Sequence, residues 1–223
     1  MHNWLDRTVE LMLDLLFPRQ CVACREFGAW WCVDCQGKIE LTRPSDMPLV
    51  QGSEGIASLG FYHEPILRAV IHALKYRGGH CILPDIERFV RTWSMDRALP
   101  WAGENDLVIQ PLVGAPRRIR ERGFDQADLL ARTLGPFLSE TGRSVDLLKR
   151  RDSSMAQAML EHHELRQANV QDMFMIKADQ NVPRAVLLID DVLTSGSTLS
   201  EAARVLREHG VERIYGFVLA VGK

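Results

Sequence analysis

Two adjacent carboxylates, Asp190 and Asp191, stand between an apolar run and a turn rich in hydroxyl groups. The run at 185–189 is continuously apolar, which is typical of a buried parallel strand, so the two acids come where that strand ends. Ligands of open parallel sheets bind beyond the carboxyl ends of the strands. Neighbouring like charges repel and gain nothing from packing, so the pair favours ligand binding, in which carboxylates accept hydrogen bonds from adjacent hydroxyl groups.

The turn after the two acids is suited to an anion. We predict that five residues bind a phosphate through backbone N–H groups and hydroxyls: Thr194, Ser195, Gly196, Ser197 and Thr198. A helix expected to begin near Leu199 adds the positive end of its dipole. The turn lacks the patterns of nucleotide triphosphatase and dinucleotide loops, whereas ribose 5-phosphate has the diol and the single phosphate that fit. Thr198 has a second interpretation, because Glu201 would complete a helix capping box with it.

Four of the five cysteines form two C-x-x-C pairs, Cys21 with Cys24 and Cys32 with Cys35. Two such pairs can place four thiolates tetrahedrally around one zinc ion, and free or redox-active cysteines are the alternative. Four thiolates leave no open coordination position, so the predicted site is structural. Zinc binding, on the order of 10 kcal/mol, would supply the folding energy of so small a segment.

Composition and charge describe an ordinary globular chain. The 223 residues are 46% hydrophobic and 25% charged with a net charge of -2, so overall electrostatics demands neither nucleic acid nor an anionic membrane. Charged residues interrupt the apolar segment at 4–17, which excludes a signal peptide or spanning helix there and favours a cytoplasmic protein. The same segment predicts an amphipathic helix docked on the protein body, with membrane-surface binding as the alternative.

Strands alternate with helices along most of the chain. We expect strands at 56–62, 106–112, 144–150, 172–177, 185–191 and 213–221, and helices around 66–76, around 82–95, from Phe124 and from Leu199. This order predicts an α/β fold with a mostly parallel sheet covered by helices on both faces. A stretch rich in Pro, Gly and Ser reads as a linker, so we divide the chain into a helix and zinc module at 1–47 and a larger domain at 48–223.

The stretch LLIDDVLTSGST, at 187–198, resembles the signature of type I phosphoribosyltransferases, which bind 5-phosphoribosyl 1-pyrophosphate (PRPP). The resemblance implies that Asp190 and Asp191 hold the ribose 2- and 3-hydroxyls and that 194–198 hold the 5-phosphate. Beyond it, the four-cysteine module, HALKYRGGH, RERGFDQADLLA and AQAMLEHHELRQAN follow one another as in the ComF family, also called GntX-like. That family is implicated in natural competence and DNA uptake, and its members resemble phosphoribosyltransferases with an added zinc ribbon.

Phosphoribosyl transfer needs positive charge where pyrophosphate departs, from Mg²⁺ and from Arg or Lys. Arg118 and Arg122 belong to an arginine cluster just after the strand at 106–112, and Lys75 and Arg77 belong to the family's L-K-Y-R pattern. A solvated basic face is the alternative for each arginine. The family pattern further implies a flexible loop over the site, at 152–169, with three residues that carry the pattern: Gln157, Arg166 and Asn169.

The chain departs from these patterns at a few positions. Gln110 lies where the family tends to have the first proline of Pro-Val-Pro, and Asp125 lies where it tends to have asparagine. Related enzymes often have a general base a few residues after the ribose pair, but Val192 and Leu193 follow it here. The general base of any transfer is therefore unidentified.

Three functions remain open from the sequence. The first is a phosphoribosyltransferase acting on an unknown acceptor, and the second is a PRPP-binding regulatory protein without turnover, which the missing base favours. The third is a competence factor that binds single-stranded DNA through its zinc module and arginine cluster, with DNA-uptake proteins as candidate partners. The aromatic pair Trp30 and Trp31 fits that third function, but packing against the cysteine module and the first helix is a plainer interpretation.

Overall fold

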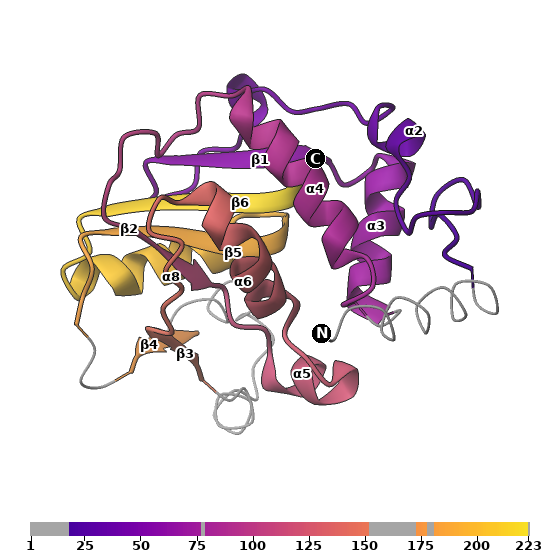
Figure 1. Cartoon of the computed structure of the whole chain (residues 1–223). Helices are drawn as coiled ribbons and strands as arrows, with labels where there is room; N and C mark the ends of the chain where they lie inside the picture. The colour runs from indigo at the N-terminus through magenta and orange to yellow at the C-terminus, as the bar shows by residue number, and fades with distance from the viewer. Residues whose placement is uncertain (1–17, 77–78, 152–172, 178–180, 223) are drawn as a thin grey trace, which may run out of the picture.

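The computed structural model describes residues 18–76, 79–151, 173–177 and 181–222 (Figure 1). Two predicted features lie outside the described residues, the N-terminal helix and the loop at 152–169. The same holds for four of the predicted site residues: Arg77, Gln157, Arg166 and Asn169. No helix among the described residues is long and apolar enough to cross a membrane.

The main sheet has four parallel strands in the order β1-β6-β5-β2. Their bounds are β1 (Gly55–Phe61), β2 (Leu107–Pro111), β5 (Ala185–Leu193) and β6 (Arg213–Val221). The two central strands, β5 and β6, are buried along almost their whole length, which is why both read as continuous apolar runs. The predicted α/β class is confirmed.

Helices cover both faces of this sheet (Figure 1). Three of them, α3 (Pro65–Tyr76), α4 (Leu83–Met95) and α6 (Gln126–Leu138), pack on one face, and α8 (Ser197–Glu208) packs on the other. Alternate residues of β5 enter the two cores: Leu187 and Ile189 join the first, and Val186 and Leu188 the second. Parallel pairing with β2 on one side and β6 on the other sets the register of β5, and with it the position of the two acids at its end.

The stretch predicted as a strand at 144–150 is divided between two sheets. Ser144 forms a parallel bridge with Ile109 beside β2. Farther along, β3 (Leu148–Arg150) pairs antiparallel with β4 (Phe174–Ile176) in a separate two-stranded sheet. The buried side chain of Gln110 marks the change, because its Oε1 accepts from the Leu147 N–H at 2.7 Å and its Nε2 donates to the Pro111 carbonyl at 2.7 Å. Gln110 therefore has a structural role, because its side chain joins the backbone of β2 to that of the segment before β3.

The cysteine module is docked on α4 through Trp31. Its side chain is fully buried, and its ring lies 4.6 Å from that of Phe89. The backbone N–H of Trp31 donates to Asp85 at 2.9 Å, and that buried carboxylate also pairs with Arg88. Trp30 packs against the same core, which also contains Cys21 and Cys35, so the predicted packing against the cysteine module is confirmed. The other predicted partner, the N-terminal helix, lies outside the described residues.

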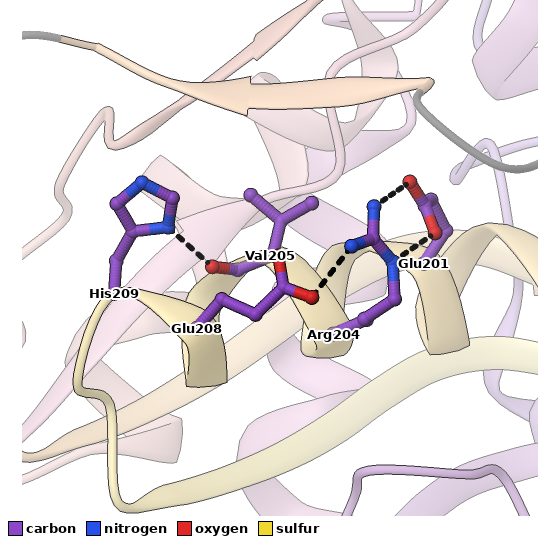
Figure 2. Close-up of polar contacts among 5 residues, drawn as sticks. All are labelled: Glu201, Arg204, Val205, Glu208 and His209. Carbon is purple, nitrogen blue, oxygen red and sulfur yellow. Dashed lines mark hydrogen bonds and ion pairs between the residues drawn. The ribbon is translucent and has the colours of Figure 1, made fainter.

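A salt-bridge ladder runs along α8 and rules out the capping box considered for Thr198. The helix begins at Ser197, with Gly196 as its N-cap and no capping side chain, so Thr198 already lies inside the first turn. Figure 2 shows where the Glu201 carboxylate goes instead: both of its oxygens accept from Arg204, at 2.8 and 2.9 Å, and Arg204 also reaches Glu208. The capping-box interpretation is therefore wrong.

Candidate functional site

Asp190 and Asp191 lie at the carboxyl end of β5, as the sequence predicts. Asp191 is only 5% exposed, and its backbone N–H donates to Oδ1 of Asp190 at 2.8 Å. Burial of the Asp190 carboxyl group, together with the neighbouring Asp191 charge, raises the pKa of Asp190 to about 8. Two desolvated like charges side by side are unfavourable for folding, and a ligand or cation at this edge would relieve that cost.

Lys75, at the C-terminal end of α3, partly balances the two acids. Its Nζ lies 3.1 Å from Oδ2 of Asp191, and Lys75 also opposes the upward pKa shift of Asp190. The contact is an ion pair without hydrogen-bond geometry, because Oδ2 of Asp191 is buried and accepts no hydrogen bond among the described residues. This oxygen is therefore a buried acceptor whose hydrogen-bonding capacity is unused among the described residues.

The predicted phosphate turn and Asp190 line one small hollow. All five residues from Thr194 to Thr198 take part, with Asp190 at one side. Gly196 has a positive φ of 77°, and a Cβ there would come within 3.1 Å of the Val50 side chain, so the turn needs glycine at this position. The hydroxyls of Ser195 and Ser197 lie 2.5 Å apart. The first-turn N–H groups of α8, which lack helical partners, follow directly.

The predicted cations Arg118 and Arg122 lie on α5 (Pro116–Arg122), a short helix that the sequence analysis did not predict. Arg118 is exposed, and its positive charge helps to lower the pKa of Arg150. Arg122 lies over the Tyr76 ring, 5.0 Å from its centroid. The structure therefore brings Lys75, Arg118 and Arg122 to the lining of one cavity, next to Asp191.

Arg150 is a site residue that the sequence analysis missed. It ends β3, and its Nη1 donates to the Val113 carbonyl in the turn after β2, at 3.3 Å. Burial and the nearby Arg118 charge lower the pKa of Arg150, while Asp190 and Asp125 act in the opposite direction. A partly buried guanidinium that interacts with Asp190 is suited to a multiply charged ligand. The only sequence signal is the basic run at 149–151, which we read as the end of a strand.

Asp125 has a structural role. Its two oxygens accept from the Gly114 N–H at 2.8 Å and from the Ala127 N–H at 3.0 Å. The carboxylate thus caps α6 and braces the turn after β2 at the same time. This use of both oxygens explains how the chain accommodates an acid where the family pattern has asparagine.

The four cysteines of the N-terminal module form one cluster. The Sγ atoms of Cys21, Cys24, Cys32 and Cys35 all lie within 4.8 Å of one another, and those of Cys24 and Cys32 are 3.6 Å apart. Four sulfurs bound at about 2.3 Å around a tetrahedral zinc would be separated by roughly 3.8 Å, so the donor set fits. The predicted four-cysteine cluster is confirmed, and it can hold a metal ion such as zinc.

Comparison with known proteins agrees with this architecture. The phosphoribosyl transferase domain family matches residues 121–222. Competence protein F from Haemophilus influenzae is 39% identical over 164 residues, which cover 73% of this chain and 70% of that protein. Competence protein ComFC from Streptococcus pneumoniae is 29% identical over 116 residues, or 52% of this chain and 48% of that protein. For the DNA utilization protein YhgH from Escherichia coli, the identity is 32% over 154 residues, or 68% and 66%. The chain spans less than two thirds of the latter two relatives. It belongs to the ComF family and contains a phosphoribosyl transferase domain.

Proposed function

We propose that the edge of the sheet at β5 binds PRPP or a related ribose 5-phosphate. Asp190 and Asp191 hold the 2- and 3-hydroxyls, and residues 194–198 hold the 5-phosphate. The supporting observation is the shared hollow, in which a desolvated carboxylate and a glycine-dependent turn at a helix N-terminus face one space. A ligand that carries both a diol and a phosphate can bind the carboxylate through its hydroxyls and the turn through its phosphate at the same time.

Pyrophosphate lies beyond the ribose in PRPP, so its charges must meet cations near the two acids. We propose Lys75 and Arg150 for this role, because Lys75 pairs with Asp191 and the charge of Asp190 acts on Arg150. Arg118, predicted for the same role, lines the cavity beyond Lys75 instead. Mg²⁺, when bound with PRPP, neutralises the developing charge of the leaving group. Arg122 was predicted for the same role, but its guanidinium is turned toward Tyr76.

We further propose zinc as the ion of the cysteine cluster, with a structural role, and keep 1–47 and 48–223 as the two domains. All four cysteines coordinate, which leaves no position for a substrate. The names of the relatives support a role in competence and DNA uptake. Metal analysis of the purified chain should give one zinc per molecule, and replacing Cys21 with serine should remove it.

The function we favour is phosphoribosyl transfer to a nitrogen acceptor, with a PRPP-binding regulatory protein as the second candidate. Val192 and Leu193 provide no carboxylate after the ribose pair, which is the observation that favours the second. Both functions require PRPP binding. Release of pyrophosphate in the presence of an acceptor would support the transferase, whereas PRPP binding without release would support the regulatory protein.

Calorimetry with PRPP and Mg²⁺ tests the shared requirement. The wild-type chain should bind one PRPP, and the D190N/D191N variant should bind at least about 100-fold more weakly, because it loses charge-assisted hydrogen bonds worth roughly 1.5–3 kcal/mol each. Glu212→Gln is the control, since that exposed carboxylate is paired with Arg184 at the opposite end of the sheet. Failure of the wild-type chain to bind PRPP, with single-stranded DNA bound in a strongly salt-dependent way, would instead support the DNA-binding candidate.

A further inference from the structure

A cavity of about 430 Å³ lies where the end of α3 meets α5 and the turn that follows α5. Its lining combines cations with aromatic rings: Lys75, Tyr76, His80, Arg118, Arg122 and Phe124. Binding sites for small molecules typically have volumes of roughly 300–1,000 Å³ and carry a few convergent polar groups. The cavity therefore has the size and the chemistry of a site for one small ligand.

The rings of this cavity are available to a flat ligand. Tyr76 is 61% exposed, and Arg122 holds it from one side, with a hydrogen bond of 3.3 Å from Nη2 to the phenol oxygen. Phe124 lies 5.7 Å from the ring of His80. A Cβ at Gly79 would come within 3.1 Å of Phe124, so the turn after α3 brings the backbone close to that ring. Exposed rings at a cavity wall favour stacking on a planar aromatic molecule.

Arg118 and Arg122 keep the cavity positively charged, whereas the charge of Lys75 is balanced by Asp191. The one acid among the described lining residues, Glu121, is paired with Arg117 at 2.7 Å. Nη1 of Arg122 is buried and has no hydrogen-bond partner among the described residues. A buried guanidinium donor without an acceptor is unfavourable, and a carboxylate on the ligand would satisfy it. The ligand that fits is therefore both planar and anionic.

The position of the cavity relates it to the proposed ribose site. Lys75 lines the cavity, and its Nζ lies 3.1 Å from Asp191. If Asp191 holds a ribose hydroxyl, the space beyond Lys75 is close to the anomeric carbon, because C1 is bonded to C2. A molecule bound in the cavity could then approach C1.

We propose that this cavity binds the acceptor of phosphoribosyl transfer, and that the acceptor is a planar nitrogen heterocycle bearing a carboxylate. The inference rests on the proposed function. The ring nitrogen donates its lone pair to C1 of PRPP, the C1–O bond breaks, and its electron pair leaves with pyrophosphate. A nitrogen that carries no proton, or has already released it to water, needs no general base. Such an acceptor is consistent with Val192 and Leu193 after the ribose pair.

The test uses the full chain with Mg²⁺ and PRPP and a panel of matched probes. Orotate, nicotinate, quinolinate and imidazole-4-carboxylate are each compared with the same ring lacking the carboxylate, by pyrophosphate release and by calorimetry. At least one carboxylated probe should release pyrophosphate. Arg122→Gln should lower kcat/KM for that probe by about 10- to 100-fold, the effect of losing a charge-assisted contact, and leave the Kd for PRPP within about twofold.

Two further variants make the result specific. Tyr76→Leu should weaken the carboxylated and the uncarboxylated ring to a similar extent, because it removes stacking from both. Arg184→Gln is the matched control, since Arg184 is an exposed arginine paired with Glu212 at the amino end of β5, and it should change neither measurement.

The outcomes separate this inference from the proposed function. If PRPP binds but no carboxylated probe binds or reacts, the acceptor assignment is overturned and the PRPP site stands. The acceptor assignment is overturned equally if Arg122→Gln leaves the preference for the carboxylate unchanged. If PRPP itself does not bind to the wild-type chain, both the proposed function and the inference fail.

Discussion

Lys75→Met tests the charge balance at the two acids most directly. The Lys75 and Asp191 side chains are 20% and 7% exposed, with 3.1 Å between Nζ and Oδ2. Removing the lysine leaves Asp191 buried beside Asp190 without a counter-charge, and breaking a buried pair in this way costs about 3–5 kcal/mol. Because Lys75 retains some contact with water, we expect the lower value, about 3 kcal/mol, or a fall in Tm of roughly 6–12 °C for a chain of this size.

The assay is a double-mutant cycle measured by urea denaturation at pH 8 and at pH 6. Lys75→Met alone should be strongly destabilising, and adding Asp191→Asn should recover about 2 kcal/mol, since the unpaired charge is then gone. The loss should be smaller at pH 6, because Asp190, whose pKa is raised to about 8, is then protonated and no longer repels the Asp191 charge. Lys177→Met is the control, because Lys177 pairs with Asp146 at the surface and should contribute less than about 1 kcal/mol. A loss of under about 0.5 kcal/mol for Lys75→Met at pH 8 would refute the reasoning.

Three more predictions follow from single contacts. The pKa of Asp190 is raised to about 8, so the folded chain keeps a proton that the unfolded chain releases; stability should fall as the pH rises toward 8, and Asp190→Asn should abolish that fall in denaturation curves. Trp31→Ala removes a fully buried ring packed on Phe89 and should reduce the free energy of unfolding by about 3–5 kcal/mol, with earlier zinc release on heating. Gly196→Ala forces a side chain into a positive φ and against Val50; it should cost roughly 1–2 kcal/mol by thermal denaturation and weaken PRPP binding in calorimetry.

The main sheet was predictable because its central strands are visible in the sequence as continuous apolar runs. Residues 185–189 are apolar without interruption since β5 is covered by helices on both faces, and the acids follow where the cover ends. The four cysteines were predictable for a similar reason, because their spacing alone brings the thiolates together. In both cases the residues that determine the local structure are close together in the sequence.

Features that depend on contacts between distant segments could not be predicted in this way. Arg150 reaches the site only because β3 leaves the main sheet after Leu147, where the Gln110 side chain takes over a hydrogen bond. The ion pair of Lys75 with Asp191 joins residues more than a hundred positions apart. The capping box failed for a local reason instead: the helix begins at Ser197, before Thr198, and Arg204 on the same helix binds the Glu201 carboxylate.

Hydrogen-bond satisfaction separates polar residues that serve the fold from those that await a ligand. Asp125 and Gln110 depart from the family pattern, and the polar side-chain atoms of both form hydrogen bonds with backbone groups of the protein. Asp191 and Arg122 instead have buried atoms without a hydrogen-bond partner among the described residues, and both lie at or beside a cavity. A missing partner alone is insufficient, because Trp31 Nε1 is also unsatisfied and lies in the core. The combination of a charged, unsatisfied atom with an adjoining cavity is what points to a ligand, and it occurs here on both sides of Lys75.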